Sequence, residues 1–282
     1  MGEVRITVLG IAQDGGAPQP GCAKPCCTTL RHKGIRHAPA GIGIEGVDGS
    51  RHLIDISRAI GDWLEVWGAS EFASISLTHG HLGHIDGLGM LGCEVMNMDG
   101  VALYGSSKMI DFIGINPLHA DLIEAGRVKP QIIDGPYAPS PGCGFTLEWV
   151  RVPHRDEHTD TGAFLVRGPK HTLLYLPDHD TWEETLGLYG ATSIRKWLSE
   201  MGVDIALIDG TFWDDSELGR ERMQNVPHPR VKETLNRLSA KQLGDPDLQF
   251  IHLNHTNPLL LDDAPVRDLG WAIAAPGDVH AL

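Results

Sequence analysis

Three histidines lie within six residues in the segment Thr78–His84, which reads Thr-His-Gly-His-Leu-Gly-His. They are His79, His81 and His84, and they directly follow a short apolar run, Phe72–Leu77. Neutral imidazole is a common ligand of zinc, iron and other first-row metals. A turn that leaves a strand can fold such closely spaced rings around one ion. The spacing therefore predicts a metal centre, and a metal-free histidine-rich loop is the alternative.

Further side chains of ligand type follow other apolar runs along the chain. His154 comes after the run that ends at Pro153, Asp178 directly follows Pro177, and His255 follows Asn254. One such residue alone often serves only as a cap or a turn residue. Because each of them stands where a strand ends, we expect four loops to meet at one sheet edge and to complete the site.

The elements that must position these residues alternate between strand-like and helix-like segments, which predicts an α/β fold. No repeat, linker or low-complexity tract divides the 282 residues, so we expect one domain spanning residues 1–282. We expect strands at Val4–Leu9, His52–Ile56, Phe72–Leu77, Ala102–Tyr104, Phe145–Val152, Ala163–Val166, Thr172–Leu176, Ile205–Ile208 and Leu248–Leu253. We expect helices at Arg58–Trp67, Lys108–Ile113, Leu118–Glu124, Thr181–Leu188, Ser193–Glu200 and Arg230–Leu238.

Composition narrows the class of partner. The formal net charge is −14, which opposes nonspecific attraction to phosphate backbones and to anionic membranes. No apolar run reaches the roughly 18 to 20 residues of a membrane span. The first ten residues read as a strand rather than as a basic leader with an apolar core. We therefore expect a cytoplasmic protein with a small-molecule substrate and without a nucleic-acid or membrane partner; a homodimer is left open.

The order of these residues between Leu77 and Asn257 resembles the metallo-β-lactamase superfamily. The resemblance implies a four-layer αβ/βα sandwich, in which helices flank two β-sheets and one or two metal ions lie at the strand ends. Matched one position at a time, three histidines would hold the first metal and three residues the second, with Asp178 bridging. The first set is His79, His81 and His154, and the second is His84, Asp178 and His255.

One position departs from the superfamily pattern. The superfamily usually has aspartate where this chain has Gly83, and that carboxylate normally binds the second metal and helps to orient the water. Glycine can do neither. Asp86 is a conceivable replacement as a ligand, and proton transfer would fall to Asp178, to Asp14 or to Asp86.

Several further stretches resemble one branch of the superfamily, the relatives of pyrroloquinoline-quinone biosynthesis protein B. Within this branch a glycine at the Gly83 position is ordinary. The biosynthetic protein itself tends to have lost metal-binding histidines, whereas this chain keeps His79, His81, His84 and His255, so the resemblance implies a metal-competent relative. The stretches that carry it are Gly10–Gly16, Pro18 with Gln19, Thr78–His84, Val152–Glu157, Asp209–Phe212, Pro227–Pro229 and Ile251–Pro258.

Three of the five cysteines, Cys22, Cys26 and Cys27, fall within six residues. In a reducing compartment such a group favours thiols or metal over disulfides. Three thiolates can hold a structural zinc if a fourth ligand arrives from elsewhere, and relatives in the superfamily are similar in this respect. His252, His228 and Cys93 are candidates for that ligand. The alternatives are a loop of free thiols and, for His252, a hydrogen-bonded core histidine.

These observations favour hydrolysis of a small-molecule ester, phosphodiester or amide by metal-activated water. The expected cofactor is Zn²⁺, one or two ions at the histidine site, with iron or manganese as alternatives. A second hypothesis is Fe-dependent oxygenase or hydroxylase chemistry related to quinone-cofactor biosynthesis, and a third is a metal-binding protein whose catalysis has decayed. Asp55 and Asp209 end apolar runs, so they serve either as hydrogen-bond partners of ligating imidazoles or as caps.

Overall fold

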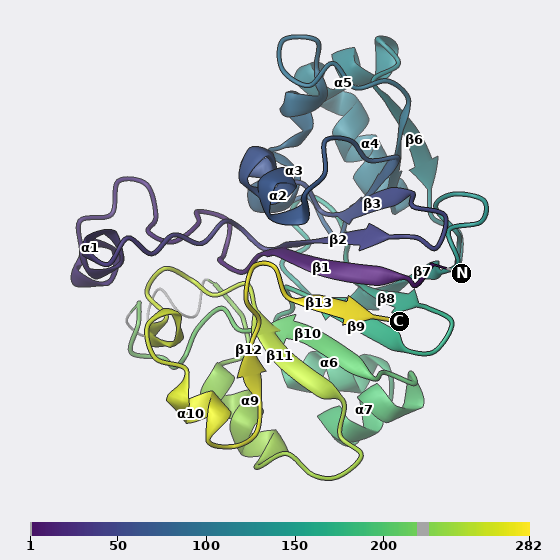
Figure 1. The fold of residues 1–282 in the computed structure, drawn as a ribbon. Helices are drawn as coiled ribbons and strands as arrows, with labels where there is room; N and C mark the ends of the chain where they lie inside the picture. Colours follow the sequence, from purple (N-terminus) through teal and green to yellow (C-terminus); the bar gives the residue numbers. More distant parts are fainter. Residues whose placement is uncertain (1, 219–225) are drawn as a thin grey trace.

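The computed structural model describes residues 2–218 and 226–282, and its centre is two β-sheets packed face to face (Figure 1). The first sheet has seven strands in the order β13 (Val279–Ala281), β1 (Arg5–Gly10), β2 (Gly41–Glu45), β3 (Arg51–Ile54), β4 (Ser74–Ser76), β5 (Val101–Gly105) and β6 (Val128–Ile132). The second has six in the order β12 (Ala272–Ile273), β11 (Asp247–Ile251), β10 (Ile205–Asp209), β9 (Thr172–Leu176), β8 (Thr161–Arg167) and β7 (Thr146–Val152).

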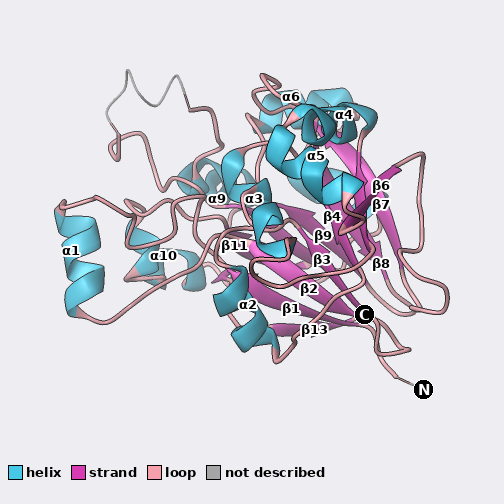
Figure 2. Cartoon of the chain, turned by 90° about the horizontal axis from the view of Figure 1, so that it is seen from above, coloured by secondary structure: helices cyan, strands magenta, loops and turns pink. Residues whose placement is uncertain are grey.

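Helices cover the outer faces of both sheets, which makes the four layers that the resemblance to the superfamily implies. The helices α2 (Ile60–Trp67), α4 (Ser107–Ile115) and α5 (Pro117–Glu124) lie over the first sheet, whereas α6 (Trp182–Leu188), α7 (Ile194–Glu200) and α9 (Val231–Leu238) lie over the second (Figures 1 and 2). The remaining short helices are α1 (Pro25–His32), α3 (Leu82–Ile85), η1 (Leu88–Leu91), η2 (Pro258–Leu260) and α10 (Ala264–Arg267).

Apolar side chains fill two clusters on either side of the first sheet. The larger cluster lies between the sheets and under α6, α7 and α9, with Ile6, Val8 and Phe250 fully buried in it. The smaller cluster packs Leu9, Leu53 and Trp63 under α2, α4 and α5. Successive side chains of a strand point to opposite faces of the sheet, and on both faces they pack against apolar side chains. This is the pattern of a sheet that is covered on two sides.

Each strand and helix expected from the sequence is present, with ends that differ by a few residues, and several elements were missed. The strand β2 escaped notice because it contains Gly41 and Gly43, which lower strand propensity. A Cβ on Gly41 would overlap the ring of Trp63, and one on Gly43 would lie 2.5 Å from the ring of Trp67. The glycines therefore admit the indole rings of α2. The strand β6 contains Pro130 and lies at a sheet edge, where proline is tolerated.

Three strands of the first sheet and four of the second end at one common edge. The parallel pairings of β3 with β4 and of β9, β10 and β11 with one another set this alignment. The segments that follow these strands contain every histidine and aspartate proposed as a metal ligand. Within the described residues, no helix has both the length and the apolar character that a membrane crossing needs.

Candidate metal centre

Site A consists of His79, His81 and His154, whose ring nitrogens converge at the shared strand edge. His79 and His81 follow β4, and His154 follows β7. Nδ1 of His81 lies 2.9 Å from Nε2 of His79 and 3.2 Å from Nε2 of His154. Tetrahedral zinc with bonds of about 2.0–2.1 Å would hold its nitrogen ligands about 3.3 Å apart. The observed spacing fits one ion held by three rings.

The hydrogen-bond partners of site A show that these inward nitrogens carry no hydrogen. Nδ1 of His154 donates to Asp180 at 3.0 Å, and Nε2 of His81 donates to Glu157 at 3.3 Å. Nδ1 of His79 lies 3.0 Å from the hydroxyl of Thr78. That hydroxyl gives its own hydrogen to a carboxylate, so it accepts from His79.

A neutral imidazole has one N–H, and each of these rings uses it on an outward partner. Three lone pairs therefore face one another within van der Waals distance. Such an arrangement is repulsive in itself and becomes favourable around a cation. The donor set fits a divalent metal such as zinc or iron.

Site B consists of Asp14, His84 and His252, which also lie close enough together to share one ion. Oδ1 of Asp14 is 3.5 Å from Nε2 of His84 and 3.4 Å from Nε2 of His252. His84 donates from Nδ1 to Asp55 at 2.8 Å, which again leaves Nε2 free of hydrogen in the neutral ring. Asp14 comes from the loop after β1, far from the other two residues in the sequence.

Asp14 occupies the space in which a side chain at position 83 would lie. A Cβ built on Gly83 would be 2.5 Å from Cγ and 2.6 Å from Cα of Asp14. The carboxylate that the superfamily usually supplies from position 83 therefore comes here from another strand end. Glycine at position 83 is what allows Asp14 to enter, so the departure from the superfamily pattern does not leave site B without a carboxylate.

Asp178, which follows β9, lies between the two sites with one carboxylate oxygen toward each. Oδ1 is 3.7 Å from Nε2 of His154 in site A. Oδ2 is 3.1 Å from Nε2 of His84 and 3.5 Å from Nε2 of His252 in site B. Oδ2 is buried and has no hydrogen-bond partner among the described residues. A bridging position between two ions would satisfy this oxygen, and the position agrees with the resemblance-based expectation.

Burial and neighbouring charge prepare the two sites differently. Burial, together with the neighbouring imidazoles, lowers the pKa of His79 well below its usual value and lowers the pKa of His81 to about 4, so these two rings of site A are neutral. Burial alone would also lower the pKa of His84, but the carboxylates of Asp55 and Asp178 outweigh it and raise that pKa. Site B thus concentrates negative charge that either a proton or a metal neutralises.

A second layer of polar side chains fixes the orientation of the ligands. Asp55 accepts from the backbone N–H and the hydroxyl of Thr78 as well as from His84. It adopts a left-handed backbone with φ of 65°, a strained conformation that often occurs at functional sites. Asp180 holds His154. Asp55, expected either to hold an imidazole or to serve as a cap or turn residue, holds His84. Asp180 and Glu157 were not expected, because no sequence pattern marks either residue.

The two histidines near the end of the domain are exchanged relative to the expectation. His255 was expected at the second metal, but it lies with the cysteines, and His252 belongs to site B. The strand was expected to run to Leu253, whereas β11 ends at Ile251. His252 then takes a φ of 64°, which turns its ring toward the site. Nothing in the sequence marks this left-handed residue.

Two further expectations are corrected. Asp86 does not reach site B, because its carboxylate binds the backbone N–H of Arg58 at 2.6 Å and the guanidinium of the same residue. His228 does not join the cysteines. It is buried beside site A, with its ring centroid 5.1 Å from that of His154. Its Nδ1 donates to Asp209 at 2.7 Å, and Asp209 also accepts from the backbone N–H of Thr211 two residues on. Asp209 is therefore both the hydrogen-bond partner of an imidazole and a turn residue.

Cys22, Cys26, Cys27 and His255 form a separate group, called here the cysteine cluster, whose ligand atoms all lie within 4.8 Å of one another. Nδ1 of His255 is 3.2 Å from Sγ of Cys27 and 3.6 Å from Sγ of Cys26. Zinc bonds of about 2.3 Å to sulfur and 2.0 Å to nitrogen give such separations. Burial raises the pKa of the Cys27 thiol to about 11, a tendency that a bound cation reverses. Cys93 is exposed and lies outside this group.

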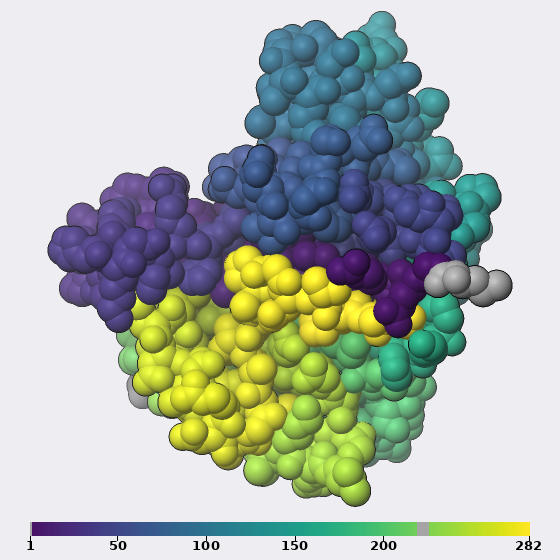
Figure 3. All heavy atoms as spheres, viewed as in Figure 1, coloured from purple at the N-terminus to yellow at the C-terminus, as the bar shows by residue number. Residues whose placement is uncertain are grey.

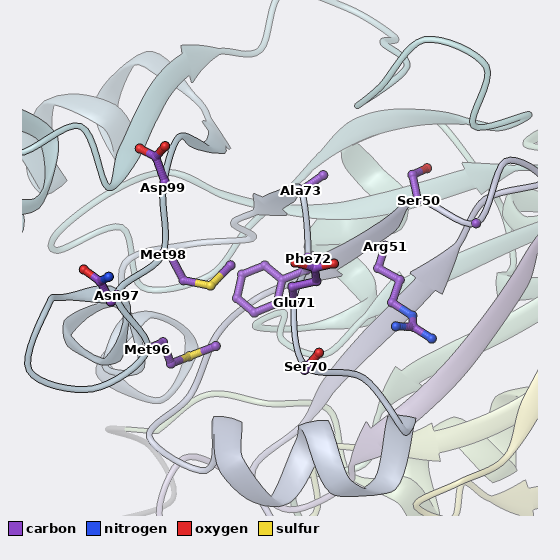
Figure 4. Close-up of a pocket in the computed structure, with 11 residues that line it drawn as sticks. Ser50, Arg51, Ser70, Glu71, Phe72, Ala73, Met96, Asn97, Met98 and Asp99 are labelled. Atoms are coloured by element: carbon purple, nitrogen blue, oxygen red, sulfur yellow. The ribbon is translucent and has the colours of Figure 1, made fainter.

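The hollow in Figure 4 lies at the opposite edge of the first sheet from the metal centre. It has a volume of about 560 Å³ and is lined by Arg51, which begins β3, by Phe72 and Ala73, which precede β4, and by Met96–Asp99, which precede β5. Its lining contains no residue of sites A and B. The hollow is therefore formed by residues separate from those of sites A and B.

Comparison with known proteins agrees with this geometry. A model of the beta-lactamase superfamily domain matches residues 68–253. The coenzyme PQQ synthesis protein B of Methylobacterium radiotolerans is 29% identical, and the match covers 97% of this chain and 98% of that protein.

Two solved structures resemble the whole chain. The structure of Zn²⁺-bound PqqB from Methylobacterium extorquens has a TM-score of 0.74 at 21% identity, covering 99% of this chain and 100% of that one. A diphosphatase from the PhnP family has a TM-score of 0.70 at 20% identity, covering 99% and 97%. The matched segment contains site A, His84, Asp178 and His252, and the full-length relatives extend the match over nearly the whole chain. The chain therefore belongs to the beta-lactamase superfamily, in the branch whose full-length relatives are named coenzyme PQQ synthesis protein B.

Proposed function

We propose that this protein is a metal-dependent hydrolase that cleaves a small-molecule ester, phosphodiester or amide at sites A and B. The observation that carries the proposal is the convergence in site A of three ring nitrogens that bear no hydrogen. When bound there, a zinc ion would lower the pKa of a coordinated water and polarise the bond to be cleaved. The Zn²⁺-bound structure of a full-length relative and the diphosphatase of similar fold support the same assignment.

The chain's own residues then divide the remaining work. Asp180 and Glu157 keep His154 and His81 in the tautomer that presents a lone pair inward. Asp178 is buried between the sites and, because His252 and His84 outweigh the effect of burial, its pKa lies well below its usual value. It therefore stays ionised and can accept a hydrogen bond from water or substrate held between the sites.

His228 and Asp209 form a pair suited to proton transfer beside site A. The carboxylate of Asp209 accepts from Nδ1 of His228 and also from the backbone N–H of Thr211. A histidine oriented by a buried carboxylate can exchange a proton at its other nitrogen. We assign this pair the protonation of the leaving group, and we assign Asp14 to site B as a ligand.

The proposal is tested by loading the purified protein with zinc and measuring release of nitrophenol from bis(4-nitrophenyl) phosphate. His79→Ala removes a ligand of site A and is expected to abolish turnover. The matched variant His171→Ala replaces an exposed histidine outside the site and should leave the rate unchanged. Equal rates in wild type and His79→Ala would contradict the proposal.

A second candidate is oxidation of an aromatic or amino-acid-derived compound at iron. Histidines combined with a carboxylate also suit Fe(II), and the name of the relatives, coenzyme PQQ synthesis protein B, points to quinone-cofactor formation. Anaerobic purification followed by metal analysis separates the two. Stoichiometric iron with oxygen uptake would favour oxidation, whereas zinc with phosphodiester turnover would favour hydrolysis.

A further inference from the structure

Of the three histidines of site A, His81 is the one that solvent reaches. Its side chain is 12% exposed, whereas His79 and His154 are each 1% exposed. A molecule that enters site A from solvent therefore passes the ring of His81. The side chains around that ring are the ones that the rest of a bound molecule touches.

Two stacked aromatic rings, called here the platform, border this opening. They are His158, in the loop between β7 and β8, and Phe112 of α4, with ring centroids 5.4 Å apart and 19° between the ring planes. The residue His158 is exposed and Phe112 is half-buried. Helix α4 belongs to the part of the chain that forms the upper end of the molecule in Figure 3. The platform therefore offers an aromatic surface to solvent beside the metal centre.

The platform lies within reach of a group that is bound to an ion in site A. The ring centroid of His158 is 6.3 Å from that of His81. Zinc–nitrogen bonds of about 2.0–2.1 Å place the ion about 3 Å from the His81 centroid, so the His158 centroid is at most about 9.5 Å from the ion. Aromatic rings interact at centroid distances of about 4.5–7 Å. A ring that an ester linkage joins to a metal-bound group, centred about 5 Å from the ion, therefore reaches His158 even at that limit.

Hydrogen bonds and close packing hold the platform against the loop that carries two ligands of site A. The backbone N–H of Gly80 in that loop donates to Oγ1 of Thr159 at 2.8 Å. A Cβ on Gly80 would lie 3.2 Å from the ring of Phe112. Asp160 accepts a hydrogen bond from the hydroxyl of Ser106, which caps α4. The rings are therefore fixed relative to the ion before a ligand binds, which lowers the entropy cost of binding.

The charges near the platform are paired with one another, which leaves apolar and aromatic groups for a ligand. Glu157 lies 3.9 Å from Nε of Arg155, and Asp156 forms an ion pair with Arg151. Leu82, the residue after His81, is 65% exposed, although the other residues of α3 are buried. A large apolar side chain that is exposed beside a buried metal centre is stabilised when an apolar group of a ligand covers it.

We propose that the platform and Leu82 bind an aryl group of the substrate, so that the metal centre acts on aryl esters or aryl phosphodiesters in preference to their alkyl counterparts. This inference rests on the proposed hydrolytic function and names its substrate class. A flat ring extends the stack of His158 and Phe112 and gains the attraction between aromatic rings in addition to burial. An alkyl group gains from burial alone.

The test measures binding of phenyl phosphate and of methyl phosphate to the zinc-loaded full chain by isothermal titration calorimetry. The two ligands carry the same phosphate group and differ in the aryl or methyl group. Wild type should bind phenyl phosphate more tightly. His158→Ala should lower the affinity for phenyl phosphate about three- to tenfold and leave that for methyl phosphate within about twofold. Phe112→Leu, which keeps an apolar side chain against Gly80, should act in the same direction.

Two further variants and the zinc content serve as controls. His158→Phe should retain the preference of wild type for phenyl phosphate, because it keeps an aromatic ring. His171→Ala replaces an exposed histidine outside the platform and should change neither affinity. The zinc content of His158→Ala should equal that of wild type. A loss of zinc from the histidine centre in this variant would place the role of His158 in metal binding and overturn the inference.

The inference would also be overturned if wild type showed no preference for phenyl phosphate, or if His158→Ala weakened both ligands equally or neither. Turnover of bis(4-nitrophenyl) phosphate tests the proposed function separately. If turnover is absent while the preference for phenyl phosphate depends on His158, the proposed function fails and the aryl site is supported. If turnover is present and the preference does not depend on His158, the function is supported and the aryl site is rejected.

Discussion

Replacing Gly83 tests whether Asp14 has taken the place of the missing carboxylate. Gly83 lies in α3 and its φ is not positive, so its backbone does not require glycine. Alanine would even be favoured by about 1 kcal/mol through helix propensity. The obstacle is space, because a Cβ there would lie 2.6 Å from Cα of Asp14, whereas carbon atoms in contact are about 3.5–4.0 Å apart.

The cost follows from how far Asp14 must move. Admitting a methyl group at position 83 requires Asp14 to retreat by about 1 Å, and overpacking of this kind costs about 1–3 kcal/mol. The retreat also carries Oδ1 away from Nε2 of His84 and of His252, which lie at 3.5 and 3.4 Å. Metal bonds to oxygen and nitrogen are about 2.0–2.2 Å long, so the three atoms could no longer share an ion. Since the gain in helix propensity of about 1 kcal/mol offsets part of this cost, we expect Gly83→Ala to lower the free energy of unfolding by up to about 2 kcal/mol. It should lose metal from site B alone.

The assay is urea-induced unfolding combined with metal analysis after dialysis. Gly61→Ala is the matched control, since Gly61 lies in α2 and an added Cβ meets nothing within 4 Å. That variant should be as stable as wild type or more stable by up to about 1 kcal/mol. Gly83→Asp should lose site B as Gly83→Ala does, and adding Asp14→Gly should restore part of the metal. If Gly83→Ala kept full metal content and matched Gly61→Ala in stability, the account of Asp14 would be refuted.

Three further outcomes are expected. Asp55→Asn keeps a residue that tolerates the left-handed backbone but removes the negative charge that accepts the hydrogen bond of His84. Competition with a chelator should show that the metal affinity of site B falls about 10- to 100-fold. An unchanged affinity would argue against Asp55 as the partner that orients His84. His52 is buried, and burial lowers its pKa to about 4. The unfolded chain therefore binds a proton more readily than the folded chain, and the free energy of unfolding should fall by about 3 kcal/mol as the pH falls from about 6.5 to 4. Urea unfolding of His52→Gln should show a shallower dependence on pH, and a slope as steep as that of wild type would contradict this. Cys27→Ser should remove about one zinc per chain and speed tryptic cleavage after Arg31 and Lys33, whereas an intact zinc content would show that the cysteine cluster does not hold it.

Hydrophobic patterns and residue order predicted the α/β architecture and the shared strand edge. His154 and Asp178 directly follow apolar runs, and His79 and His81 come within four residues of the end of one, so their convergence could be expected from sequence. The order of these residues along the chain also pointed to the superfamily. The same reasoning favoured a three-cysteine group, because three thiols within six residues must lie close together whatever the fold.

The remaining features depend on three-dimensional packing that sequence patterns do not report. Asp14 and Gly83 are far apart in the chain. That Asp14 supplies the carboxylate missing at position 83 is evident only from the close approach of the two residues in the structure. The left-handed conformation of His252 decides which of two nearby histidines faces the metal centre. Asp180 and Glu157 act through hydrogen bonds across loops. For the same reason the capture of Asp86 by Arg58 could not be expected.

The metal content of wild type and of two variants decides whether the histidine centre and the cysteine cluster are separate metal sites. We expect His79→Ala to lose metal from the histidine centre and to keep the zinc of the cysteine cluster, and Cys27→Ser to show the reverse. Wild type should contain the metal of both. If His79→Ala retained the full metal content of wild type and its activity, sites A and B would not be a metal centre.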